Sequence, residues 1–218
     1  QLTVEKSALG FYFSGHLFDE VAEEVGQFVS RRLADVQESR QPVLLAGVVS
    51  HFRAINGRRG RIGLFRLDDK SAVLEARVDQ AVMETARQVL RDDEVIVVMA
   101  RVLPDRFSGG LQLDITQVWD LPEARCCFGK FLHVAAGPGG PEVEQLLHRF
   151  PPRMAETESG SVPNGLPIRM ALECRADNAA GVRVELQLGD DVRCYPSDEA
   201  LAGWRAQAGA QHARVVYE

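Results

Sequence analysis

The chain has 218 residues, 45% of them hydrophobic and 26% charged, and its formal net charge is −6. This composition is typical of a globular protein that forms one large or two small domains. No stretch approaches the roughly 18–20 consecutive apolar residues of a membrane helix, and no signal-peptide pattern opens the chain, so we expect a cytoplasmic protein without a membrane partner. Because the first residue is Gln1 and not Met, we also expect a piece of a longer protein.

Residues 1–39 predict a helical segment of two short helices. The first would bring Leu2, Leu9, Tyr12 and Phe13 onto one face. In the second, apolar residues recur at spacings of three and four, which is the helical period: Phe18, Val21, Val25, Phe28 and Val29. Such a stripe usually docks on a hydrophobic core.

Residues 40–122 predict a run of strands interrupted by one helix. Asn56-Gly57 is a strong hairpin signal, because both residues tolerate a positive φ. Asp79 is suited to cap the helix that follows the third strand. The expected strands cover residues 43–55, 61–67, 72–78, 94–102 and 111–119, and the expected helix covers 79–93.

The order of these elements, three strands, a helix and two strands, is that of an OB-fold, a five-stranded barrel. In that fold the face of strands two and three and the loops 1–2 and 4–5 bind oligonucleotides. Here both loops carry arginine, in NGRRG (56–60) and in PDRFSGG (104–110). The overall prediction is therefore a β-rich chain, in which an OB-fold barrel precedes a small α/β domain.

Residues 126–218 predict that separate α/β domain. The expected strands are 128–136, 167–176, 182–188, 192–196 and 213–218, and the expected helices are 142–150 and 197–209. Between them, residues 154–165 are expected to form a polar loop. Trp204 and Leu201 in the last helix are either core residues or, with Arg205, an anchor for a partner protein.

Four stretches of the sequence carry a resemblance: EKSALGFYFSGH, RRGRIGLFRLDDKSAVLEARV, FSGGLQL and LGDDVRCYPSDEAL. Together and in this order, they resemble the C-terminal region of the alpha subunit of bacterial DNA polymerase III. The resemblance implies that residues 1–39 are the tail of a preceding domain and that the OB domain contacts single-stranded template DNA. It also implies that residues 126–218 bind the tau subunit of the clamp loader, alongside other subunits of the polymerase III holoenzyme.

The arginines of the middle segment are the main candidates for DNA contact. Residues 51–66 hold five arginines and no acidic residue. Without the OB-fold context, an arginine-rich hairpin tip is more often an ordinary solvated loop. With it, these side chains lie at the rim of the expected binding groove, where each can pair with a phosphate. The candidates are Arg53, Arg58, Arg59, Arg61 and Arg66, with Arg106 in the second loop.

Aromatic platforms for bases are few, so we expect weak, sequence-tolerant binding. Phe107 beside Arg106 is the better candidate for stacking. Phe65 has two possible orientations: if Leu64 faces the core, Phe65 can stack on a base, and in the opposite register Phe65 belongs to the core.

No catalytic constellation and no cofactor motif is present in the sequence, so we expect a non-catalytic part of a DNA-directed DNA polymerase, a nucleotidyltransferase. Asp68-Asp69 suggests a metal site, but a turn in which aspartate bonds its own backbone is the better interpretation. The four cysteines, Cys126, Cys127, Cys174 and Cys194, lack the CxxC spacing of a zinc site and are expected to be reduced. The alternative function is a replisome module that binds proteins only.

Overall fold

The computed structural model describes residues 16–57, 60–105, 109–136, 142–157, 160–174, 182–189, 191–209 and 212–217. The chain divides into two compact units, Gln1–Leu121 and Pro122–Glu218. The first unit includes the described part of the predicted helical segment as well as the barrel, and the predicted three-part division stays a prediction. No helix among the described residues is long and apolar enough to cross a membrane.

The predicted helix over residues 18–29 is broken into shorter pieces. They are η1 (Leu17–Glu20) and α2 (Ala22–Val25); a separate short helix, η2 (Leu33–Asp35), follows outside the predicted range. His16 caps η1, because its Nδ1 accepts a hydrogen bond of 3.1 Å from the Phe18 N–H. Of the predicted apolar stripe only Val25 is buried, so too little packing supports a longer helix. The other predicted helix, with Leu2 to Phe13, lies outside the described residues.

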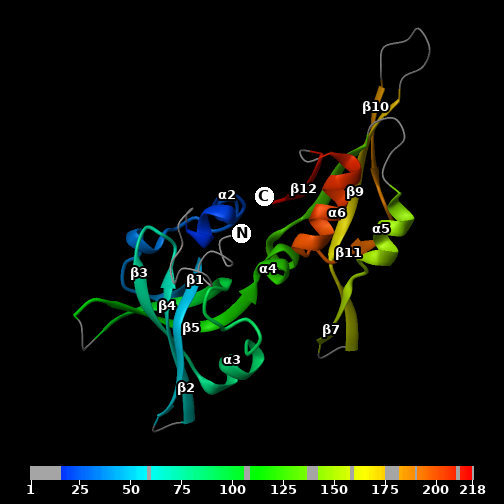
Figure 1. Cartoon of the computed structure of the whole chain (residues 1–218). Helices are drawn as coiled ribbons and strands as arrows, with labels where there is room; N and C mark the ends of the chain where they lie inside the picture. The colour runs from blue at the N-terminus through cyan, green and yellow to red at the C-terminus, as the bar shows by residue number, and fades with distance from the viewer. Residues whose placement is uncertain are drawn as a thin grey trace, which may run out of the picture. The chain divides into compact units, whose positions relative to one another are not determined.

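Five strands of the first unit form a closed barrel in the order β1-β2-β3-β5-β4 (Figure 1). The β3–β5 pair is parallel, and the other pairs are antiparallel. This is the OB-fold topology, so the predicted fold class is confirmed. The predicted helix is shorter than expected, since α3 ends at Thr85. The elements are β1 (Ser39–Gly57), β2 (Gly60–Asp68), β3 (Val73–Val78), α3 (Gln80–Thr85), β4 (Val95–Pro104) and β5 (Leu111–Asp120).

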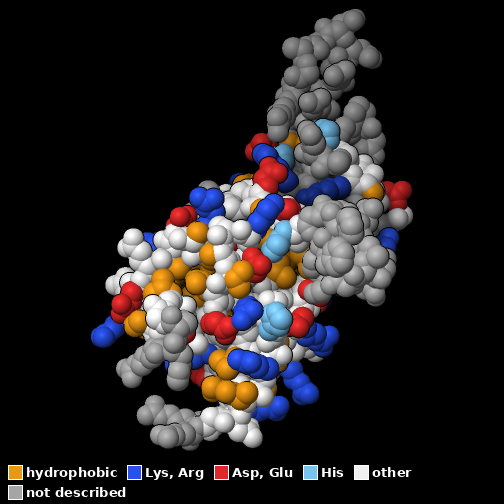
Figure 2. Space-filling model, turned by 60° about the vertical axis from the view of Figure 1, so that its left-hand side comes forward, with side chains coloured by type: hydrophobic (Ala, Val, Ile, Leu, Met, Phe, Trp, Pro, Cys, Tyr) orange, Lys and Arg blue, Asp and Glu red, His pale blue; other side chains and the backbone are white. Residues whose placement is uncertain are grey.

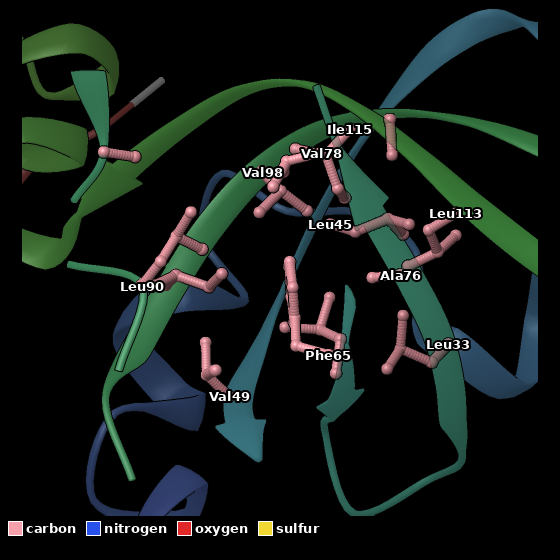
Figure 3. Packing of buried hydrophobic residues seen from close by; sticks show 14 of the residues in the cluster. Leu33, Leu45, Val49, Phe65, Ala76, Val78, Leu90, Val98, Leu113 and Ile115 are labelled. Carbon is pink, nitrogen blue, oxygen red and sulfur yellow. The ribbon is translucent and has the colours of Figure 1, made fainter. Parts of the chain in front are cut away.

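The barrel core decides the orientation of β2. Phe65 is only 1% exposed and packs among Leu45, Val49 and Leu33 (Figure 3). Its ring centroid lies 6.4 Å from that of Phe52, which also packs against the core. The assignment of Phe65 as a base-stacking residue is therefore wrong: strand alternation turns Phe65 and Leu67 inward and leaves Leu64 partly exposed.

The second unit is an α/β domain built on a sheet in the order β10-β9-β6-β12, with β11 paired to β9. Two predictions for this unit were wrong or incomplete. Residues 154–165 form most of a hairpin, β7 with β8, instead of a loop, and α4 was not predicted. The elements are α4 (Leu121–Phe128), β6 (Phe131–Ala136), α5 (Val143–Arg149), β7 (Arg153–Thr157), β8 (Gly160–Asn164), β9 (Leu166–Cys174), β10 (Val182–Gln187), β11 (Arg193–Cys194), α6 (Asp198–Ala208) and β12 (Ala213–Val216).

Helix α6 packs into the core of the second unit. Ser197 caps it by accepting a 3.1 Å hydrogen bond from the Ala200 N–H, and Gly209 ends it with a φ of 100°. Leu201 is 1% exposed and Trp204 is 0% exposed. Neither side chain reaches the surface, so their assignment as partner contacts is wrong. Arg205 is exposed, but its Nε donates to the Ala213 carbonyl at 3.1 Å and thereby ties α6 to β12.

Candidate nucleic-acid interface

The outer surface of β1, β2, β3 and β5 carries two rows of side chains set by strand register. Arg53 pairs with Leu64, Leu64 with Arg77, and Arg77 with Asp114. In the next row, Ser50 pairs with Arg66, Arg66 with Glu75, and Glu75 with Gln112. We call these two rows the barrel face; they hold three arginines and two carboxylates.

Two of the three arginines are engaged in ion pairs within the barrel face. Arg66 Nε lies 3.0 Å from Glu75 Oε1, and Arg77 Nε lies 2.8 Å from Asp114 Oδ1. The four side chains are between 25% and 52% exposed. Exposed pairs of this kind contribute only about 0–1 kcal/mol, so a phosphate can replace the carboxylate at little cost.

A bulge in β1 shapes the barrel face. The register of β1 against β2 shifts between Ser50 and Arg53, and His51 takes a left-handed backbone conformation with a φ of 56°. A side chain from the segment before β4 stabilises the bulge, because Asp92 Oδ1 accepts a 2.8 Å hydrogen bond from the Phe52 N–H. It turns both His51 and Arg53 out into solvent.

The bulge opens a hollow of about 200 Å³ in the barrel face. Its lining combines a histidine, two arginines and a carboxylate over an apolar floor: His51, Arg53, Arg66, Glu75 and Phe65. Arg53 forms no ion pair with the described residues, unlike Arg66. The hollow therefore presents a solvated guanidinium beside one that a weak pair restrains, which suits an anion.

Of the predicted arginines, three fall within the described part of the chain. Arg53, Arg61 and Arg66 are all exposed. Arg61 is the second residue of β2, and its backbone N–H donates to Gln80 Oε1 at 3.3 Å. The remaining candidates, Arg58, Arg59, Arg106 and Phe107, lie outside the described residues. Their roles stay predictions.

The positive charge is local and not spread into a single basic surface. Figure 2 shows Lys and Arg side chains interspersed with Asp and Glu on the face in view. Within the described parts of β1, β2 and β3, no aromatic side chain is exposed, since Phe52 and Phe65 turn inward. Aliphatic side chains stand there instead, with Ile55 at 41% and Val73 at 52% exposure.

Asp68-Asp69 forms a turn, as the sequence suggested. Asp69 Oδ2 accepts a 2.7 Å hydrogen bond from the Leu33 N–H, and Asp69 Oδ1 accepts from the Ser71 N–H at 2.9 Å and from the Ser71 hydroxyl at 2.6 Å. The carboxylate thus anchors Leu33, at the start of η2, to the turn between β2 and β3. No group of three metal-ligating side chains occurs among the residues that the structure describes.

Sequence reasoning missed His51, Glu75, Arg77 and Asp114. A signal for the bulge was present, because the core positions of β1 change from odd numbers, Leu45 and Val49, to an even one, Phe52. A break in strand alternation of this kind marks an inserted residue. The ion pairs depend on cross-strand register, which the sequence did not give.

Comparison with curated proteins relates this chain to the same subunit in several bacteria. The chain is 28% identical over 218 residues to the DNA polymerase III subunit alpha of Pseudomonas aeruginosa, covering 100% of this chain and 18% of that protein. It is 30% identical over 218 residues to the same subunit of Escherichia coli K12 (98% of this chain, 18% of that protein). For Vibrio cholerae the identity is 31% over 204 residues (92% and 17%).

Along the whole length of this chain, its sequence is related to that of the DNA polymerase III alpha subunit. The resemblance to the C-terminal region of that subunit is thus confirmed. The chain spans less than a fifth of the length of these relatives. No family model matches it.

Solved structures add little. The second OB-fold domain of replication protein A from Methanococcus maripaludis matches with a TM-score of 0.33 and 9% identity, covering 42% of this chain and 93% of that one. At this TM-score the match carries no argument about this chain.

Proposed function

We propose that the chain is a non-catalytic C-terminal part of a replicative DNA polymerase alpha subunit. In this role the OB barrel binds single-stranded template DNA, and the second unit binds the tau subunit of the clamp loader and so joins the other holoenzyme subunits. Polymerisation itself belongs to the longer protein. The observation that carries the DNA proposal is the arginine-bearing barrel face on the strands that OB-folds use for oligonucleotides.

Electrostatics supports DNA on the barrel face despite the acidity of the whole chain. Arg53 is solvated, and Arg66 and Arg77 are held only by exposed ion pairs. A phosphodiester offers each guanidinium a charge-assisted contact, and charges elsewhere in the protein are screened beyond about 8–10 Å at physiological ionic strength. The local charge therefore decides the interaction.

The same face predicts how the binding responds to salt. Each phosphate contact on a single strand contributes about −0.7 to the slope of log K against log[salt]. Three contacts, through Arg53, Arg66 and Arg77, make binding about 20-fold weaker at roughly 200 mM salt than at roughly 50 mM. Without an exposed aromatic residue among the described strands β1 to β3, stacking adds little there, and binding tolerates any sequence.

The tau proposal rests on the relationship to the alpha subunit, and in particular on the stretch LGDDVRCYPSDEAL in the second unit. With Leu201 and Trp204 buried, the contact surface must lie elsewhere on that unit. Arg205 is exposed and stays a candidate.

Fluorescence anisotropy with a labelled oligothymidylate, titrated at several salt concentrations, tests the DNA proposal. Arg53→Ala/Arg66→Ala and Arg58→Ala/Arg59→Ala/Arg61→Ala are compared with the wild type. Arg87→Ala, an exposed arginine after α3, is the matched control.

We expect salt-sensitive binding by the wild type and the control, with weaker binding and shallower slopes for both multiple variants. No binding at low salt, or binding that neither multiple variant changes, would exclude this surface as a DNA-binding site. The chain would then be a module that binds only proteins.

A further inference from the structure

Strand β10 forms one edge of the sheet in the second unit, because it pairs with β9 and with no other described strand. The Leu188 N–H donates to the Ile168 carbonyl at 3.0 Å. In an antiparallel ladder such bonded positions alternate, so residues 184 and 186 also direct their backbone groups toward β9. Glu185, between them, directs its N–H and C=O away from the sheet, where a further strand can pair.

The side chains of this edge strand are unusually apolar on one side. Val184 is 37% and Leu186 is 45% exposed. Register puts them beside Leu172 and Met170 of β9, respectively. Met170 is 7% exposed and belongs to the core. The apolar side of β10 therefore continues the core-facing side of the sheet, but its own side chains are left partly exposed.

A hollow continues this apolar side toward helix α5. It measures about 550 Å³ and is lined mainly by aliphatic side chains, with two polar ones at its rim: Val143, Leu147, Leu188, Val192, Glu144 and His148. Leu188 follows β10 directly and belongs to both surfaces. We call the hollow together with Val184 and Leu186 the β10 groove.

Acidic side chains lie on both sides of strand β10. Glu144 lies at the rim of the β10 groove, Asp191 lies in the turn after β10, and Glu185 projects from the opposite side of the strand. All three are exposed, and none forms an ion pair with the described residues. The groove thus combines an available strand edge, an apolar trough and negative charge.

We propose that the β10 groove binds an extended segment of a partner protein that adds to the sheet as a strand beside β10. Alternate side chains of this segment are apolar and enter the groove, and the side chains between them are basic and face Glu185. Backbone hydrogen bonds supply affinity, and the trough and the acidic groups supply specificity. This inference rests on the proposed partner-binding role of the second unit and names where and how that partner binds.

Proline at residue 185 tests the backbone pairing directly. Since the Glu185 N–H points away from β9, Glu185→Pro preserves the internal ladder but removes the donor that an added strand needs. Glu185→Ala removes only the charge and is the matched control. Leu186→Lys tests the trough. Circular dichroism melting curves confirm that each variant is folded.

Binding of the 218-residue chain to purified tau subunit is measured by biolayer interferometry. We expect at least a tenfold loss of affinity for Glu185→Pro and for Leu186→Lys, and about a twofold loss for Glu185→Ala. Equal binding by the wild type and all three folded variants overturns the inference but leaves the tau proposal intact.

If the wild type does not bind tau, the tau proposal fails. A synthetic ten-residue peptide of alternating valine and lysine then tests whether the β10 groove accepts an added strand. Shifts of the amide signals of β10 in the ¹⁵N-labelled wild type, absent in Glu185→Pro, support strand addition. Absence of shifts in the wild type overturns it. A wild-type dimer in sedimentation that Glu185→Pro converts to a monomer also contradicts the inference, because a second copy then occupies the edge.

Discussion

Replacing Asp69 by alanine removes the anchor between the turn after β2 and the segment that precedes the barrel. Its carboxylate accepts hydrogen bonds from the Leu33 N–H at 2.7 Å, from both donors of Ser71, and from the Ala72 N–H at 3.1 Å. The residue is only 9% exposed. Asp69→Ala leaves the buried Leu33 N–H without an acceptor.

Hydrogen bonds to a charged group contribute about 1.5–3 kcal/mol each, and a buried donor left unpaired costs about 1–3 kcal/mol. Water replaces part of the loss at the more exposed Ser71 and Ala72, so we expect Asp69→Ala to lower the free energy of unfolding by about 3–5 kcal/mol. Asp68→Ala is the control. It loses a 2.8 Å bond from the exposed Lys70 N–H and a 3.4 Å contact with His16, and we expect a loss of about 1 kcal/mol.

Urea titration followed by hydrogen exchange and mass spectrometry measures the difference. Peptides from β1 report on the barrel alone, which matters because two units need not unfold as one. If Asp69→Ala destabilises β1 no more than Asp68→Ala does, the carboxylate is not the anchor and our interpretation of the turn is wrong.

Three further predictions concern the barrel face and the second unit. Glu75→Gln frees Arg66 and removes a negative charge, so affinity for oligothymidylate should rise about two- to threefold at low salt. Arg53→Ala should lower this affinity. If fluorescence anisotropy shows that both variants change the affinity in the same direction, the interaction is not electrostatic in origin. Burial raises the pKa of the Cys194 thiol to about 11 from its ordinary 9.0. The unfolded chain therefore releases this proton first as pH rises from 9 to 11, and stability falls by about 2 kcal/mol over that range; Cys194→Ala should remove this fall, and a pH profile that the variant leaves unchanged would contradict the prediction. Trp204→Ala should destabilise the second unit by about 3–5 kcal/mol, yet binding of tau should fall only with the folded fraction; a loss in fully folded protein would make Trp204 a direct contact.

The fold of the barrel could be predicted because its local signals agree. Asp79 caps α3 by accepting a 2.9 Å bond from the Val82 N–H, and apolar alternation marks the strands. Asn56-Gly57 located the hairpin only approximately, because both residues pair within the β1–β2 ladder and the positive φ of 116° falls at Gly60. The hairpin of β7 and β8 was missed because its strands bury little, with Met154 62% and Val162 42% exposed, so no alternation separates it from a loop. Helix α4 was missed although its start carries a signal, with Asp120 at the N-cap position, Pro122 in the first turn and Glu123 three residues after Asp120.

The candidate site could be predicted only in part. Arginine content located the barrel face at Arg53 and Arg66, which are exposed as expected, whereas Arg61 is exposed but lies outside its two rows. Which of them are held by a carboxylate depends on how strands pair, and Glu75 and Asp114 come from strands distant in sequence. The orientation of Phe65 was open for the same reason, because a shift of one residue in strand register turns every side chain of the strand to the opposite face.

A titration of the ¹⁵N-labelled chain with a ten-nucleotide oligothymidylate at low salt, followed by NMR, tests the central claim most directly. We predict that the amide signals of Arg53, Arg66 and Arg77 shift together, and that the signals of α3 and of the second unit stay in place. Shifts confined to residues outside the barrel face, or no shifts at all, would contradict the proposal that this OB barrel binds single-stranded DNA through β1, β2 and β3.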